Sequence, residues 1–174
     1  VDAQSHDGKT IIHCAAKDGN SEILQQALGR KSSYSKFPVR DGVPTPGVYA
    51  VREAKDPKGL EKVLDALMDR EPNPQHVAVE AIKRGSRELL DHLITKKVVD
   101  VSERFVYSEG QETTLAFEAL GAGQYDIVKY LIKNGAAVEG VANESALAAG
   151  ILGGCFQGRR AVLHMERVIG AGAS

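Results

Sequence analysis

The stretch DGKTIIHCAAKDGN, residues 7–20, contains two groups of residues that enzymes and metal sites use. Gly8-Lys9-Thr10 matches the last three positions of a P-loop, whose backbone N–H groups cradle phosphate oxygens. A P-loop also needs a glycine five residues before the glycine of this tripeptide, and this chain has Ala3 there. The spacing therefore argues against phosphate binding. We expect Gly8 to form a turn and the Thr10 hydroxyl to cap a helix.

The adjacent pair His13-Cys14 could in principle hold a metal ion or form a nucleophile. Zinc sites need several donors at short spacings such as CxxC or HxxxH, whereas the other histidines stand singly at positions 6, 76, 92 and 164. A Cys–His catalytic pair must face each other, and neighbours on a helix diverge by about 100°. We therefore expect a structural role for His13, and for Cys14 either packing or an exposed thiol.

The acidic residues do not form a catalytic pattern. No two carboxylates share an apolar setting that would raise a pKa for acid–base work. Glu22 and Asp126 are expected at helix N-termini, where negative charge is favourable. No glycine-rich dinucleotide fingerprint follows an expected strand. We accordingly expect no catalytic residue, no cofactor and no metal ion.

The composition is that of a soluble globular protein. Of the 174 residues, 43% are hydrophobic but only 5% aromatic, so the core must be built from aliphatic side chains and alanine. The net charge is −1 and no basic stripe is visible, so we expect no nucleic-acid partner. No apolar stretch approaches the roughly 18 residues of a membrane span, so no membrane insertion is expected.

Two cysteines, Cys14 and Cys155, make no disulfide framework. They favour a reducing compartment, and we expect a cytoplasmic or nuclear protein. No secretory signal is visible, and the sequence begins at Val1 and not at Met. This start is compatible with a longer protein.

Four segments share one layout, in which a turn glycine is followed by two apolar pairs at helical spacing. The four apolar residues of each segment lie on one side of a helix. A small residue four or five positions before each glycine would let a neighbouring helix approach closely. The glycines are Gly19, Gly59, Gly85 and Gly123; the small residues are Ala15, Ala54, Ala81 and Ala119; the apolar pairs are Ile23-Leu24 and Ala27-Leu28, Val63-Leu64 and Leu67-Met68, Leu89-Leu90 and Leu93-Ile94, and Ile127-Val128 and Leu131-Ile132.

A weaker fifth copy begins at Ser145 and has its turn at Gly154. From Gly19 to Gly154 the glycines recur on average about every 34 residues. Ankyrin and tetratricopeptide repeats both have a period close to this value.

The opening stretch decides between these two families, because its residues resemble the ankyrin motif, in which a turn leads through Thr-Pro-Leu-His into two short antiparallel helices. The stretch GQYDIVKYLIKNGAAVE, residues 123–139, resembles the second half of that motif. Two departures are evident: Ile11 replaces the proline, and only the first repeat is expected to keep the histidine. The matching residues of the opening stretch are Gly8, Thr10, Ile12, His13, Ala15, Ala16, Gly19, Glu22, Ile23 and Leu28.

The resemblance implies an all-α ankyrin-repeat solenoid of about five helix-turn-helix units with short or irregular β-hairpin fingers. One array would span residues 1–174. The connection at 98–113 alternates like a two-stranded finger, 29–46 reads as a loop, and 70–74 as a tight loop. The expected repeats are 5–33, 45–73, 74–99, 110–138 and 142–174.

The resemblance also implies a non-catalytic module, such as a scaffold, that binds a partner protein on its concave and finger surface. The alternative is a targeting or regulatory ankyrin domain of a larger enzyme or multidomain protein. A third reading, that the chain is an enzyme in its own right, would need a set of catalytic residues that the sequence does not show. We expect a monomer.

The residues expected to contact a partner come from the positions that line this surface in ankyrin-like proteins. In the second repeat the equivalent positions are ambiguous, with Pro57 and Lys58 as candidates. Two finger aromatics are added as binding anchors, with burial against the next repeat as an equally open alternative. Lys17, Lys83 and Arg84 would suit acidic or carbonyl-rich segments. The expected contact residues are Asp7, Lys9, Lys17, Asp18, Lys83, Arg84, Phe105 and Tyr107.

Overall fold

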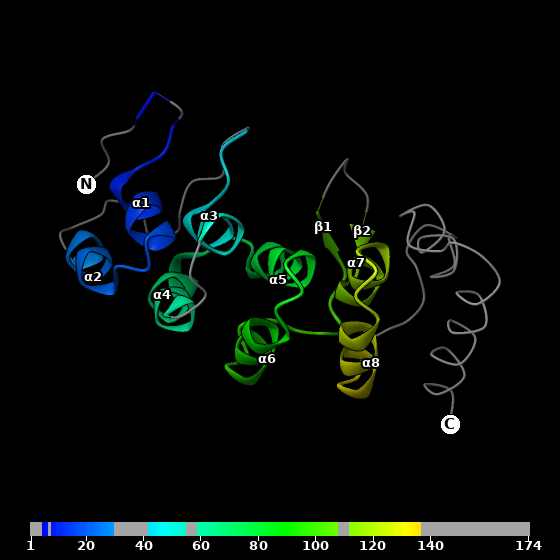
Figure 1. The fold of residues 1–174 in the computed structure, drawn as a ribbon. Helices are drawn as coiled ribbons and strands as arrows, with labels where there is room; N and C mark the ends of the chain where they lie inside the picture. Colours follow the sequence, from blue (N-terminus) through cyan, green and yellow to red (C-terminus); the bar gives the residue numbers. More distant parts are fainter. Residues whose placement is uncertain (1–4, 7, 30–41, 55–58, 108–111, 137–174) are drawn as a thin grey trace. The chain divides into compact units, whose positions relative to one another are not determined.

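The computed structural model describes residues 5–6, 8–29, 42–54, 59–107 and 112–136, and this part of the chain is mostly helical (Figure 1). The chain divides into two compact units, Val1–Arg84 and Gly85–Ser174. The N-terminal unit holds α1 (Ile11–Lys17), α2 (Ser21–Gly29), α3 (Pro46–Glu53), α4 (Leu60–Leu67), the 3₁₀ helix η1 (Met68–Arg70) and α5 (Pro74–Lys83). The C-terminal unit holds α6 (Arg87–Thr95), β1 (Phe105–Val106), β2 (Glu112–Thr113), α7 (Leu115–Gly121) and α8 (Tyr125–Lys133).

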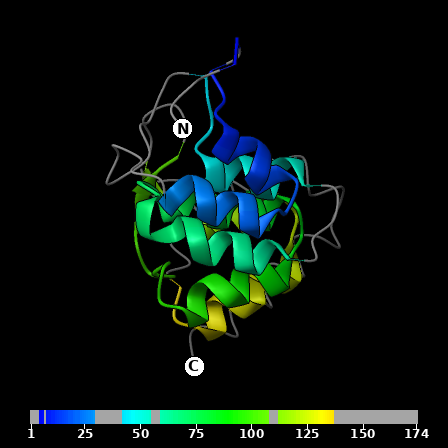
Figure 2. The same cartoon turned by 90° about the vertical axis from the view of Figure 1, so that its left-hand side faces the viewer.

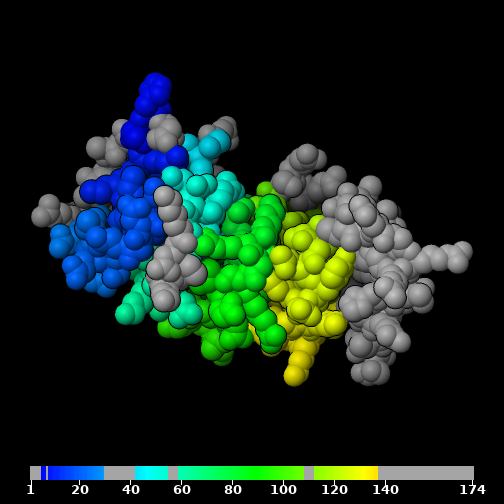
Figure 3. Space-filling view, in the orientation of Figure 1, coloured from blue at the N-terminus to red at the C-terminus, as the bar shows by residue number. Residues whose placement is uncertain are grey.

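The helices of the N-terminal unit form two rows. In one row α1 packs on α3 and α3 packs on α5, and in the other α2 packs on α4. Helices α1 and α2 also pack on each other, as do α3 and α4. Figure 2 shows α2 and α4 lying side by side. In the space-filling view of Figure 3, the helices of this unit, coloured blue to green, adjoin one another. This is the helix-turn-helix stacking that the sequence predicts.

The turn glycines adopt the backbone conformation for which glycine is suited. Gly19 has φ 69° and Gly123 has φ 71°, in the left-handed region that other residues enter at a cost. Both glycines end their helices in the same way. The N–H of the next residue donates a hydrogen bond of 2.9 Å into the helix, from Asn20 to the carbonyl of Ala15 and from Gln124 to that of Ala119. This bond satisfies a carbonyl that the helix end leaves open. The predicted turns at these glycines are confirmed.

The core is made largely of the apolar pairs that the sequence identifies. Both pairs of α4 and its continuation η1 are buried, and in α6 and α8 the first pair of each is buried. The exception is Ile23 on α2, which is 43% exposed while its neighbour Leu24 is fully buried. Leu28, Ile94 and Ile132, the last residues of the second pairs of α2, α6 and α8, are half-buried. The helical spacing therefore located the buried side of each of these helices, with Ile23 as the one exposed member of the pairs.

The first helices share a register that begins at their N-caps. Thr10, Thr45, Asn73 and Thr114 occupy the N-cap positions of α1, α3, α5 and α7. Five residues after each cap stands an alanine that is at most 5% exposed. These alanines are Ala15, Ala50, Ala78 and Ala119.

This register corrects two details of the sequence reading. Pro46 and Pro74 directly follow the caps of α3 and α5, so the proline of the motif is present in those repeats. His76 stands three residues after its cap, as His13 does in α1, so the first repeat is not alone in keeping the histidine. The alignment on turn glycines failed in the second repeat because the connection from α3 to α4 is longer than that from α1 to α2, and in the third repeat because α5 is longer than α1.

The connections follow the predictions where the structure describes them. Phe105 pairs with Thr113 and Val106 with Glu112 in an antiparallel ladder, so the predicted finger is confirmed. In the segment 70–74, residues 71–73 form a short link between η1 and α5. Most of the predicted loop at 29–46 and the whole of the expected fifth repeat, 142–174, lie outside the described residues.

One helix of the C-terminal unit ends without a glycine. Lys97 has φ 56° at the end of α6, where Val98 N bonds Leu93 O at 3.1 Å. A side chain in this conformation costs about 1 kcal/mol relative to glycine.

We therefore expect Lys97→Gly to raise the free energy of unfolding by roughly 0.5–1 kcal/mol in urea denaturation. The matched control is Lys96→Gly, because Lys96 has φ −72° and gains nothing from glycine. Its free energy of unfolding should fall by about 0.5 kcal/mol. Equal effects of the two changes would contradict this account of the helix end.

Candidate interaction surface

His13 joins the start of α1 to the chain that leads into α3. Its Nδ1 lies 3.0 Å from the backbone N of Thr10 and its Nε2 lies 3.0 Å from the carbonyl oxygen of Pro44. The Thr10 N–H donates, so Nδ1 accepts and the ring proton is on Nε2, which donates to Pro44. The ring is 6% exposed and meets Tyr49 edge-on at 5.8 Å between centroids. The expected structural role of His13 is therefore observed.

A second polar contact connects the N-terminal ends of α3 and α5. Glu71 precedes α5 and is fully buried, and its Oε2 accepts a hydrogen bond from the backbone N of Gly47 at 3.2 Å. Gly47 lies in the first turn of α3, where N–H groups have no partner within the helix. A carboxylate there also complements the helix dipole.

The C-terminal ends of α3 and α5 are joined as well. Arg84 Nη1 donates to the carbonyl oxygen of Val51 at 2.8 Å, and Arg52 contacts Glu80. Contacts of start with start and end with end mean that α3 and α5 run parallel. The His13–Pro44 contact places the start of α1 beside the start of α3 in the same way. We call the surface at the C-terminal ends of α1, α3 and α5 the first-helix surface.

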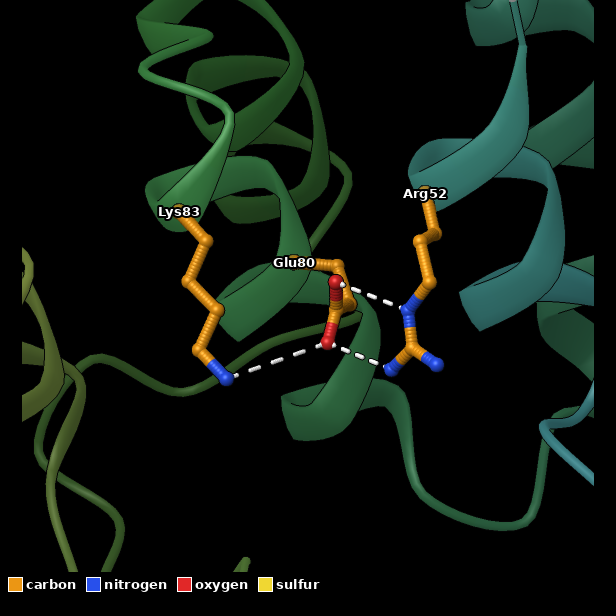
Figure 4. Close-up of polar contacts among 3 residues, drawn as sticks. All are labelled: Arg52, Glu80 and Lys83. Atoms are coloured by element: carbon orange, nitrogen blue, oxygen red, sulfur yellow. Dashed lines mark hydrogen bonds and ion pairs between the residues drawn. The ribbon is translucent and has the colours of Figure 1, made fainter. Parts of the chain in front are cut away.

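Four charged residues at the C-terminal ends of α3 and α5 lie on this surface, and we call them the Arg52 cluster: Arg52, Glu80, Lys83 and Arg84. The guanidinium of Arg52 binds Glu80 through two nitrogens, Nη2 to Oε1 at 2.8 Å and Nε to Oε2 at 3.3 Å (Figure 4). Lys83 Nζ lies 4.0 Å from the same Oε1. The Glu80 side chain is only 8% exposed, while those of Arg52 and Lys83 are 46% and 47% exposed. The two cations therefore cover the carboxylate.

Of the residues expected to contact a partner, the structure brings Lys83 and Arg84 together in this cluster. Lys17 and Asp18 form an ion pair of 3.7 Å at the end of α1. Lys9 lies at the other end of α1, with its Nζ 4.8 Å from the centre of the Tyr49 ring. Asp7 lies outside the described residues.

Arg52 was not among the contact residues expected from the sequence. The second repeat's contact residues were sought near Pro57 and Lys58, which lie outside the described residues. Counted from the N-caps, Arg52 occupies the position of Lys17, seven residues after Thr45 as Lys17 is after Thr10. The Thr45-Pro46 dipeptide was the signal that could have found it, because Pro is frequent at the first position of a helix.

The finger of the C-terminal unit carries the two predicted aromatic residues. Phe105 and Tyr107 are both half-buried, and Val106 between them is 51% exposed. The turn before the finger is fixed by Asp100, whose Oδ1 accepts hydrogen bonds from the Oγ of Ser102 at 2.7 Å and from its N at 2.9 Å. These hydrogen bonds, the hydroxyl one foremost, lower the pKa of Asp100.

A polar contact also joins α6 to α8 within the C-terminal unit. The Tyr130 hydroxyl donates a hydrogen bond to Asp91, and the guanidinium of Arg87 lies 4.8 Å from the centre of the Tyr130 ring. Burial raises the pKa of Tyr130 to about 12, the hydrogen bond to Asp91 and the charge of Asp91 add to the effect, and Arg87 opposes it.

The described residues contain no group of three or more His, Cys, Asp or Glu side chains that could hold a metal ion. Within this same part of the chain, no helix is both long and apolar enough to cross a bilayer. Cys14 is an exposed free thiol.

Comparison with known proteins identifies the fold. No family model matches the chain, and no curated protein matches it by sequence. Among solved structures 39 chains match, and one of them is the ankyrin repeat domain of human ASB11. That domain is 20% identical in sequence, with a TM-score of 0.68 over 100% of this chain and 73% of its own length. The protein therefore has a divergent ankyrin-repeat fold. This fold is a general protein-interaction module and is typically non-catalytic.

The contacts of His13 predict a measurable loss of stability on its removal. We expect His13→Ala to lower the free energy of unfolding by about 2 kcal/mol, because the Thr10 N–H and the Pro44 carbonyl then lose the hydrogen bonds that they form with the imidazole ring. Cys14→Ala, at the exposed neighbouring position, is the control and should change stability by no more than about 0.5 kcal/mol. Chemical denaturation followed by circular dichroism measures both. A loss below about 0.5 kcal/mol for His13→Ala would show that its hydrogen bonds do not stabilise the fold.

The raised pKa of Tyr130 predicts a loss of stability at high pH. The folded state holds the phenol proton more tightly than the unfolded chain, whose tyrosines ionise at about pH 10. The contribution of Tyr130 is therefore present below about pH 10 and is lost between pH 10 and about 12. Stability measured across this range should fall less steeply in Tyr130→Phe than in the wild type.

Proposed function

We propose that this protein is a non-catalytic module that binds a partner protein, and that the first-helix surface and the finger make the contact. The observation that carries the proposal is the ankyrin-repeat fold itself, in which stacked repeats present an extended surface. In the N-terminal unit the exposed ends of the first helices carry charged side chains, which supply polar recognition there.

The proposed contact residues are those expected from the sequence. Lys83, the last residue of α5, and Arg84, which follows it, are both exposed. Lys17 and Asp18 are at the end of α1. On the finger, the exposed Val106 between half-buried Phe105 and Tyr107 offers an apolar contact. Asp7 and Lys9 complete the proposed set.

The proposed setting is the cytoplasm or nucleus, with the protein acting as a monomer. The exposed thiol of Cys14 supports this setting, because exposed thiols persist in reducing compartments. The fold supports a non-enzymatic role, since ankyrin repeats are typically non-catalytic.

The test has two stages. The chain, immobilised, is used to retain proteins from an extract of its source, and retained proteins are identified by mass spectrometry. A retained protein is then purified and its Kd for the chain is measured by calorimetry. The proposed function is wrong if no retained protein binds the purified chain saturably.

The same titration tests the surface. We expect Lys83→Gln and Arg84→Gln to weaken the partner's binding by up to about fivefold each, as for exposed charge contacts. Neutral substitutions are preferred to charge reversal because Lys83 lies 4.0 Å from Glu80, where a second carboxylate would disturb the fold. Lys62→Gln, an exposed lysine of α4 in the other row, is the control. If all three variants bind with wild-type affinity, the partner uses another surface.

A further inference from the structure

We propose that the Arg52 cluster is a docking site for a peptide segment of the partner that is rich in Asp or Glu. This inference rests on the proposed function and names the chemistry that the partner presents. It also adds Arg52 to the contact residues.

Hydrogen bonds hold Arg52 and Arg84 before any partner arrives, and Lys83 lies within ion-pair distance of Glu80. Glu80 binds the guanidinium of Arg52 through two nitrogens and lies 4.0 Å from Lys83 Nζ. Arg84 is held separately by the carbonyl of Val51. Long basic side chains lose rotamer freedom when they bind, and side chains that are already ordered lose less of it.

The cluster carries more positive than negative charge. Arg52 and Lys83 both contact the single carboxylate of Glu80, and Arg84 adds a third cation whose partner, the carbonyl of Val51, bears no net charge. Glu53, next in sequence to Arg52, is exposed and reduces this excess without cancelling it. The local excess contrasts with the chain as a whole, whose net charge is −1.

The cations and not the carboxylate face an approaching molecule. The side chains of Arg52 and Lys83 are 46% and 47% exposed, whereas that of Glu80 is 8% exposed. A carboxylate that reaches this surface can accept charge-assisted hydrogen bonds from a guanidinium or an ammonium group. Repulsion from Glu80 is reduced because two cations cover it.

The chemistry favours an acidic peptide over a nucleic acid. A nucleic-acid surface needs a long basic stripe that follows many phosphates. In the N-terminal unit the cluster is confined to the ends of two neighbouring helices, and at the end of α1 Lys17 is paired with Asp18. A short segment with a few carboxylates matches this extent.

The experiment titrates the full chain into a fluorescein-labelled peptide of alternating Glu and Gly, with the Gln and Gly version as its neutral counterpart. We expect saturable binding of the Glu peptide that weakens as salt rises, and at least about tenfold weaker binding of the Gln peptide. Arg52→Gln should weaken binding of the Glu peptide by about fivefold. Arg52→Lys should restore part of the loss, because it keeps the charge but not the planar fork.

Lys62→Gln is again the control and should bind the Glu peptide as the wild type does. Circular dichroism of each variant shows whether it is folded. The proposal is overturned if the Glu and Gln peptides bind equally, if Arg52→Gln and Lys62→Gln are equivalent, or if a single-stranded oligonucleotide of equal charge binds while the Glu peptide does not. One outcome separates the two proposals. If Lys83→Gln weakens binding of a retained partner while the Glu peptide shows none of the expected binding, the acidic-peptide inference is overturned and the proposed function stands.

Discussion

The close stacking of the first helices is the constraint on which the rest of the N-terminal unit depends. A buried alanine stands five residues after the cap of α1, α3 and α5. A small side chain on the packing side of a helix lets its neighbour approach closely, and interiors are packed too densely to absorb a larger one without strain. Once the helices are this close, polar groups at their ends must find partners in the next helix, because water has limited access to them.

The polar contacts at the two ends of the row have different consequences. At the N-terminal ends, His13 and Glu71 are buried and satisfy backbone groups of the neighbouring segment. These contacts fix the register between neighbouring helices, and the two buried side chains expose little surface to a partner. At the C-terminal ends, Arg52 and Arg84 also bind the neighbouring helix, but both are exposed residues. The same contacts can therefore hold the row together and order cations for recognition.

The parts of the fold that could be predicted are those that repeat locally along the chain. Turn glycines, apolar pairs and the alternation before Thr113 are local signals, and each was sufficient to place a turn, a helix side or a strand. The pairing of Arg52 with Glu80 gave no such signal, because it joins residues of different repeats. Its presence depends on how α3 and α5 are aligned, and the turn glycines aligned the second repeat incorrectly.

The exposure of Ile23 shows a second limit of local patterns. Its helical position matches that of buried residues in α4, α6 and α8, yet it is 43% exposed on α2. Periodicity identifies the side of a helix that can be buried, whereas burial itself needs a neighbouring helix on that side. The position of a residue within a repeat therefore does not by itself determine whether its side chain is buried, because burial also depends on which helix packs beside it.

The absence of a matching family model alongside a clear match to ankyrin-repeat structures has a physical explanation. Stacking requires small, apolar and turn residues at particular positions, and many different sequences satisfy these requirements. The charged residues at the helix ends are not needed for the packing of alanines, so they are free to differ between proteins with the same fold. In this chain they form a buried carboxylate covered by exposed cations. Recognition that is particular to this protein is therefore to be sought in the Arg52 cluster and not in the residues that make the fold recognisable.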